Sequence, residues 1–194
     1  MTVMLLGLLL FLGMHSVRVF ADDWRREQIE RFGERTWRIA YSLVSIVGLT
    51  LAIWGFGAMR MSPDPIVIWV PPMWTQHVVA LLMIPAFILL VATYSPANHI
   101  RSTLGHPMLL SVMLWALSHL LVNGHFGEIL FFGAFLIWSI VAFRAARQRN
   151  RAAGKGPVVA RFRGDVIAVV VGLAFYFLFA FHLHVWITSV PALG

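Results

Sequence analysis

The sequence predicts an all-α membrane protein, a polytopic helical bundle of about six transmembrane helices with both termini periplasmic. Three observations lead to this fold class: the composition, the lengths of the apolar segments and the distribution of the basic residues. Of the 194 residues, 60% are hydrophobic and only 12% are charged, whereas a soluble domain is about 45–50% apolar and about 25% charged. A soluble protein of this size has too much surface to hide so many apolar side chains. The excess must therefore face lipid.

Six apolar segments have the length of a membrane-spanning helix. A span needs roughly 20 mainly apolar residues, within a range of about 17–25. The segments that qualify are 2–20, 37–58, 75–94, 107–123, 127–143 and 166–188. Between the first two, the polar residues 22–31 predict a short surface helix capped by Asp22 or Asp23. We expect a single transmembrane domain that covers residues 1–194.

The basic residues predict how the chain is oriented. All 15 lysines and arginines except Arg60 fall in or beside residues 21–36, 95–106 and 144–165, which share one side if the chain crosses six times. Because basic residues remain cytoplasmic, the pattern predicts a multi-pass protein of the bacterial inner membrane. Seven of these residues lie in 144–163, where contact with anionic lipid headgroups is expected. This segment lacks the interleaved aromatics of an RNA-binding surface, so no nucleic-acid partner is expected.

The residue types exclude several kinds of site. Cysteine is absent, which excludes disulfides, thiolate metal sites and cysteine nucleophiles. Glu128 and Asp165 lie only at the ends of apolar segments, so a proton-coupled transporter or a carboxylate acid–base enzyme has little to work with. A non-catalytic membrane assembly protein remains open.

The eight histidines are the informative residues, because ionisable groups inside a bilayer are costly and usually functional. At about 1.5 Å per helical residue, His119 lies roughly 18 Å from the cytoplasmic side. His77, His182 and His184 fall on the same periplasmic side of the bilayer, although His182 and His184 point about 200° apart and cannot share a site. Two axial imidazoles would hold a haem, whereas three or four would suit zinc or copper. The spacing leaves both open.

Motifs along nearly the whole chain resemble the NnrU family. The core motif reads Gly105-His106-Pro107-Met108-Leu109-Leu110 and continues as Leu114-Trp115-Ala116-Leu117-Ser118-His119-Leu120-Leu121-Val122-Asn123-Gly124. Supporting motifs are His15-Ser16-Val17-Arg18, Gly33-Glu34-Arg35 with Tyr41-Ser42-Leu43-Val44-Ser45, Pro71-Pro72-Met73-Trp74-Thr75-Gln76-His77 and Phe179-Ala180-Phe181-His182-Leu183-His184. One departure is Gly105, where the family usually has Arg before His-Pro.

The resemblance implies a bacterial integral membrane protein linked to denitrification and nitric-oxide metabolism. The family is similar to the 15-cis-zeta-carotene isomerase of plants and cyanobacteria, which uses haem b and whose two implicated ligands match His15 and His119 here. These two differ in height by about 10 Å, which suits one haem only if the porphyrin lies nearly flat, and His77 matches His119 better. We therefore expect haem b, or a metal ion, at His119, then His77 and His15, with His184 and His106 as further cofactor-binding candidates.

Two functions follow from this resemblance. The first is a haem-dependent membrane protein that supports denitrification by responding to redox state or to a gas such as nitric oxide. The second is a haem-dependent cis–trans isomerase of a carotenoid or another hydrophobic polyene lipid, so whether the chain is an enzyme stays open. The His-Pro motif also resembles lipid methyltransferases, but residues 144–164 lack the acidic residues that those enzymes use.

Overall fold

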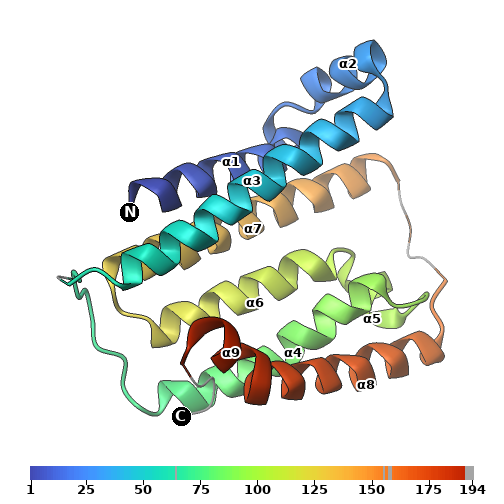
Figure 1. The fold of residues 1–194 in the computed structure, drawn as a ribbon. Helices are drawn as coiled ribbons and strands as arrows, with labels where there is room; N and C mark the ends of the chain where they lie inside the picture. Colours follow the sequence, from blue (N-terminus) through green and yellow to red (C-terminus); the bar gives the residue numbers. More distant parts are fainter. Residues whose placement is uncertain (64, 155, 157–158, 191–194) are drawn as a thin grey trace. The chain divides into compact units, whose positions relative to one another are not determined.

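The computed structural model describes residues 1–63, 65–154, 156 and 159–190. These residues form helices joined by loops (Figure 1), and within them the β-structure is limited to one antiparallel bridge between Val67 and His125. The chain divides into two compact units. Unit 1 comprises Met1–Trp69 and Gly124–Ala142, and unit 2 comprises Val70–Asn123 and Phe143–Gly194. The prediction of an all-α fold is confirmed, and each unit is described by itself.

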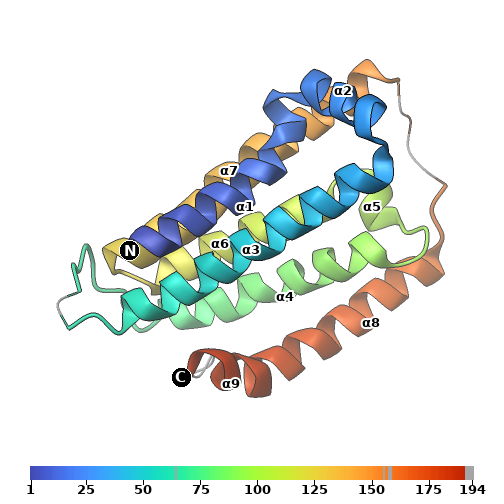
Figure 2. The ribbon, with the colours of Figure 1, turned by 45° about the horizontal axis from the view of Figure 1, so that its top comes forward.

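Unit 1 is built on two long helices that run side by side (Figures 1 and 2), α1 (Thr2–Phe20) and α3 (Glu34–Arg60), with the short helix α2 (Asp22–Phe32) between them in sequence. Glycines allow α1 and α3 to approach closely. A Cβ atom added to Gly7 would overlap the backbone of Ala52, and one added to Gly48 would overlap the backbone of Phe11. The two helices therefore pack backbone against backbone, as small residues permit inside a membrane.

The first half of helix α7 (Phe126–Ala152) completes unit 1. Its phenylalanines pack against α3, with the ring of Phe56 lying 4.6 Å from that of Phe131 and 5.7 Å from that of Phe132. Phe135 reaches α1, where its ring is 5.9 Å from that of Phe11. Aromatic stacking of this kind adds specificity to packing that lipid alone does not drive.

Unit 2 contains α4 (Thr75–Tyr94), α5 (His99–Leu104), α6 (Pro107–Val122), the end of α7 and α8 (Phe162–Leu178). Helix α4 packs against both α6 and α8. Gly172 of α8 lies against the backbone of Ile88, so that a Cβ there would come within 2.7 Å of the Ile88 Cα. Beside Pro85 of α4, the Ser111 hydroxyl of α6 donates a hydrogen bond to the Ala86 carbonyl at 2.7 Å.

Helix α8 changes its winding before it ends. It continues as a π-helix, η1 (Phe179–Leu183), and then as the short helix α9 (His184–Thr188). The segment stops at Ser189, a non-glycine residue in the left-handed region with φ of 60°. π-Helical turns inside helices are rare and occur frequently at functional sites, so the end of this helix becomes relevant to the site.

The helices confirm a multi-pass membrane protein. Within the part of the chain that the structure describes, five segments are long and apolar enough to span a bilayer, namely α1, α3, α4, α7 and the continuous stretch Phe162–Thr188. The sixth apolar helix, α6, has 16 residues and so measures about 24 Å, somewhat less than a bilayer core of about 30 Å. Large apolar side chains remain exposed on these helices, among them Leu9 (70%), Leu81 (68%) and Trp54 (65%), as expected for surfaces that contact lipid.

Two local predictions are wrong. Residues 144–152 were expected in a loop, but α7 continues through them to Ala152, because Arg, Ala and Gln are strong helix formers. Neither Asp22 nor Asp23 caps α2, since Ala21 occupies the N-cap position. Asp22 lies instead in the first helical turn and pairs with Arg26 at 3.2 Å. Lys155 of the basic segment lies outside the described residues.

Candidate functional site

His119 lies near the end of α6 with its imidazole oriented by the helix itself. Its Nδ1 donates a hydrogen bond of 2.8 Å to the Trp115 carbonyl, one helical turn earlier. The Asn123 side-chain amide donates in turn to the His119 carbonyl at 2.7 Å. Because the proton sits on Nδ1, the lone pair of the neutral ring is on Nε2. Metal-ligating histidines are usually oriented in this way, through a hydrogen bond from the second ring nitrogen.

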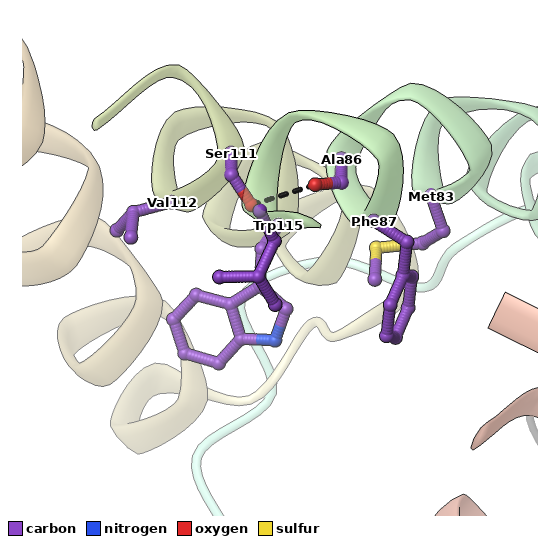
Figure 3. A pocket seen from close by; sticks show the side chains of 7 residues that line it. Met83, Ala86, Phe87, Ser111, Val112 and Trp115 are labelled. Carbon is purple, nitrogen blue, oxygen red and sulfur yellow. Dashed lines mark hydrogen bonds between the residues drawn. The ribbon is translucent and has the colours of Figure 1, made fainter. Parts of the chain in front are cut away.

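Trp115 connects this histidine with an apolar pocket of the same unit: its indole lines the pocket (Figure 3), and its ring lies 5.1 Å from the His119 ring. The pocket has a volume of about 160 Å³ and is lined, from α4 and α6, by Met83, Ala86, Phe87, Leu90, Ser111, Val112 and Trp115. The Ser111 hydroxyl is already bonded to the Ala86 carbonyl, so the lining is almost wholly apolar. An apolar cavity of about 150 Å³ takes a ligand the size of benzene, so a ring or a short hydrocarbon segment fits here.

His184 begins α9 and lies in the same unit as His119. Its Nδ1 donates to the Val190 carbonyl at 2.7 Å, which again leaves the lone pair on Nε2. The left-handed Ser189 turns the chain so that this carbonyl faces back to His184. His182, on the π-helix, is exposed, in agreement with the expectation that His182 and His184 do not face one site.

The other two predicted histidines of unit 2 are arranged differently. His77 is exposed on the first turn of α4. His106 accepts a hydrogen bond at Nε2 from the Asn150 side-chain amide at 3.1 Å, and its ring lies 6.3 Å from that of Phe143. Because Asn150 uses the Nε2 lone pair, His106 joins the start of α6 to the end of α7 in this structure.

A zinc or copper site of three or four imidazoles is not formed by the residues that the structure describes. Among them, no three His, Asp or Glu side chains gather closely enough to hold a metal ion.

His15 occupies a corresponding position in unit 1. Its Nδ1 donates to the Phe11 carbonyl at 2.8 Å. The ring is enclosed by aromatic side chains from three helices, with ring distances of 4.2 Å to Phe11, 5.1 Å to Tyr41 and 5.9 Å to Trp138. The indole N–H of Trp138 is buried and, within the described residues, has no hydrogen-bond partner.

The structure also shows a group of charged contacts that the sequence did not reveal. In unit 1, the buried Glu128 side chain contacts Arg60 Nε at 3.3 Å and His125 Nδ1 at 3.0 Å. In unit 2, Asp165 accepts a hydrogen bond from His99 Nδ1 at 2.6 Å and another from the His99 backbone N–H at 2.8 Å. The His125–Glu128 spacing was a readable signal, because residues three apart face each other on a helix start. Arg60 and His99 are too distant in sequence from their partners for such a signal.

Comparison with known proteins identifies a family for this chain. The chain matches the family model described as NnrU protein over residues 3–192. The match includes both compact units and both of the histidines, His15 and His119, that donate from Nδ1 to a carbonyl one turn earlier. No curated protein matches the chain, and no solved structure matches it.

Proposed function

This chain belongs to the NnrU family, and from that premise we propose that it is a haem b-binding protein of the bacterial inner membrane that supports nitric-oxide metabolism. The observation that carries the proposal is the hydrogen bond from His119 Nδ1 to the Trp115 carbonyl. It fixes the tautomer that an axial ligand requires and makes the ring a better electron donor. The apolar pocket beside Trp115 keeps this position poor in water.

The residues of unit 2 fit one axial ligand well and enclose the macrocycle only in part. His119 would supply the Nε2 lone pair, Trp115 lies against its ring, and Trp115 and Phe87 line the apolar pocket. The pocket of about 160 Å³ is smaller than the roughly 300–1,000 Å³ of a typical ligand site. It therefore accommodates an edge of the porphyrin, or part of another apolar ligand.

His184 is proposed as the second ligand. Its Nδ1 is also bonded to a carbonyl, that of Val190, so its Nε2 lone pair is oriented in the same way as that of His119. The resemblance implies His15 for this role, and His15 carries the same type of Nδ1 hydrogen bond. Absorption spectra of the two alanine variants distinguish these histidines.

Bound haem would supply a redox-active iron that takes up a small gas when an axial position is open. The chain's own residues hold the His119 imidazole in one tautomer, set its orientation through the helix backbone and exclude water from the Trp115 side. These tasks suit a redox or gas-responsive role in denitrification.

A cis–trans isomerase of a polyene lipid is the second candidate, and the pocket favours it. Its lining by Met83, Phe87 and Leu90 is apolar, which suits a segment of a hydrocarbon chain. A deletion strain that accumulates a cis carotenoid would support the isomerase. Impaired nitric-oxide turnover with unchanged pigments would support the first function. A non-catalytic assembly role follows if the purified protein carries no cofactor.

The test is an absorption spectrum of detergent-purified protein from haem-replete cells, recorded oxidised and reduced. The wild type should show the paired visible bands of low-spin haem, and His119→Ala should lose them. His184→Ala should keep the haem but change it to a high-spin, five-coordinate form. His182→Ala is the matched control, because this neighbouring histidine is exposed and its loss should change nothing. A colourless wild type, or unchanged bands in His119→Ala, would contradict the proposal.

A further inference from the structure

A short apolar segment of unit 1, Ile66–Trp69, is fastened by its backbone to the turn before α7; we call it the strap. The Phe126 N–H donates to the Ile66 carbonyl at 2.8 Å. The N–H groups of Ile68 and Trp69 both donate to the Gly124 carbonyl, at 2.9 and 3.3 Å. The strap is thus held in one position by three backbone hydrogen bonds.

The side chains of the strap remain largely uncovered. The exposed fractions are 62% for Ile66, 53% for Val67 and 57% for Ile68. The strap carries no charged residue, and between Arg60 and Arg101 the only Asp, Glu, Lys or Arg in the sequence is Asp64, which lies outside the described residues. A loop designed for water would not present consecutive aliphatic side chains in this way.

Three charged or titratable side chains, those of Arg60, His125 and Glu128, form a cluster beside the strap. Arg60 ends α3, Glu128 lies in the first turn of α7, and His125 lies between Glu128 and the strap. Glu128 is only 3% exposed. Its carboxylate contacts Arg60 Nε at 3.3 Å and His125 Nδ1 at 3.0 Å. Arg60 is also the one basic residue that the orientation pattern leaves on the other side from the rest. The ion pair of Arg60 with Glu128 is neutral overall, so Arg60 adds no net positive charge beside the strap.

We propose that the strap is a membrane-inserted element whose isoleucines contact lipid in the interfacial layer of the leaflet on the Arg60 side. The strap follows α3 and is bonded to the first residue of α7, two helices of membrane-spanning length in unit 1, so it lies at the level where these helices leave the hydrocarbon. Its three backbone hydrogen bonds lower the cost of placing a non-helical segment at this depth. Trp69 in the strap is the type of residue that concentrates at membrane interfaces. Lipid is therefore the occupant that covers Ile66, Val67 and Ile68.

The absence of cysteine from the sequence makes this proposal directly testable. Ile66→Cys is introduced into the full-length chain, labelled with an environment-sensitive fluorophore and reconstituted in vesicles of phosphatidylcholine, which offer no anionic headgroup to the basic segment. Ala153→Cys, exposed in the basic segment, provides the water control. Leu9→Cys, 70% exposed on α1, provides the control for a label in hydrocarbon.

The label at Ile66 should emit at shorter wavelength than the one at Ala153, resist quenching by aqueous iodide and be quenched by lipids that carry a quencher near the headgroup. Emission and iodide quenching that match those of Ala153→Cys would overturn the proposal. Emission that shifts to longer wavelength when the protein is diluted into more lipid would overturn it as well, because it would show that the free edge of the strap pairs with a second copy of the chain.

A second variant tests the role of the charged cluster. Glu128→Gln keeps the shape of the side chain but removes the charge that neutralises Arg60. Combined with Ile66→Cys, it should move the label towards water, seen as increased iodide quenching, while the Leu9→Cys label in the same background reports that the spans remain inserted. An unchanged Ile66 signal would show that the cluster does not set the position of the strap.

Discussion

His15 in unit 1 and His119 in unit 2 make the same hydrogen bond in different surroundings. Each donates from Nδ1 to the carbonyl four residues earlier, at 2.8 Å. The His15 ring is enclosed by Phe11, Tyr41 and Trp138, whose ring centres lie within 5.9 Å. The His119 ring has Trp115 on one side, and beyond Trp115 lies a pocket of about 160 Å³.

The two histidines differ in how accessible the imidazole is to a ligand, although both imidazoles are oriented in the same way. A histidine inside a helix can bond to the carbonyl one turn earlier wherever other partners are lacking, so this hydrogen bond alone does not distinguish a ligand from a packed side chain. A nearby apolar space does, and for His119 the pocket beyond Trp115 provides one. His15 has aromatic neighbours that stabilise the contact of α1 with α3 and α7.

The largest expected effect comes from separating α1 and α3. In Gly7→Leu the new side chain would overlap the Ala52 backbone, and since neither helix can yield, we expect a loss of more than about 4 kcal/mol. Unit 1 should fail to fold, which thermal unfolding followed by size-exclusion chromatography would show. Gly13→Leu is the matched control on the same helix, because nothing lies within 4 Å of a Cβ added there.

Truncating the aromatic enclosure of His15 should have the next largest effect. Trp138→Ala leaves a cavity beside the His15 ring and should cost about 3 kcal/mol, at the lower end of values for aromatic truncation in a core. Trp138→Phe removes the indole N–H, which is buried without a partner among the described residues, and should stay within about 1 kcal/mol of the wild type. The midpoint of thermal unfolding measures both. Equal losses in the two variants would show that the indole nitrogen is bonded.

In unit 2, two buried serines of α6 allow a direct comparison of a bonded and an unbonded hydroxyl. Ser111→Ala removes the hydrogen bond to the Ala86 carbonyl and should cost about 1 kcal/mol. Ser118→Ala should be neutral or slightly stabilising, because the Ser118 hydroxyl is fully buried and has no hydrogen-bond partner within the described residues. Unfolding of the two variants in the same detergent gives the comparison. A greater loss in Ser118→Ala than in Ser111→Ala would contradict this assignment.

The smallest effect is expected at the end of α9. Ser189 adopts a φ of 60°, which glycine adopts more easily. Ser189→Gly should therefore stabilise the turn by less than about 1 kcal/mol. Hydrogen exchange of the amides from Phe179 to Val190 should slow slightly, and exchange in α1 should not change. Faster exchange in this segment would show that the serine side chain, and not the turn, holds Val190 in place.

Much of the fold could be predicted because the thickness of a bilayer sets the length of apolar segments. The segment 75–94 coincides with α4, and 107–123 differs from α6 by one residue. The winding of η1 could not be predicted, since no residue pattern specifies a π-helix. A rise of 1.5 Å per residue predicts a depth for each histidine, but the direction of its side chain also depends on how the helices are rotated. That is why His77, placed near His119 by depth, is exposed on α4.

The central claim is that His119, and not His15, holds the cofactor. The most direct measurement is the haem content per protein of His119→Ala and His15→Ala, purified in parallel with the wild type from haem-replete cells. We expect His119→Ala to lose its haem, and His15→Ala to keep it while unfolding at a lower temperature. Loss of haem from His15→Ala together with full occupancy in His119→Ala would contradict the claim.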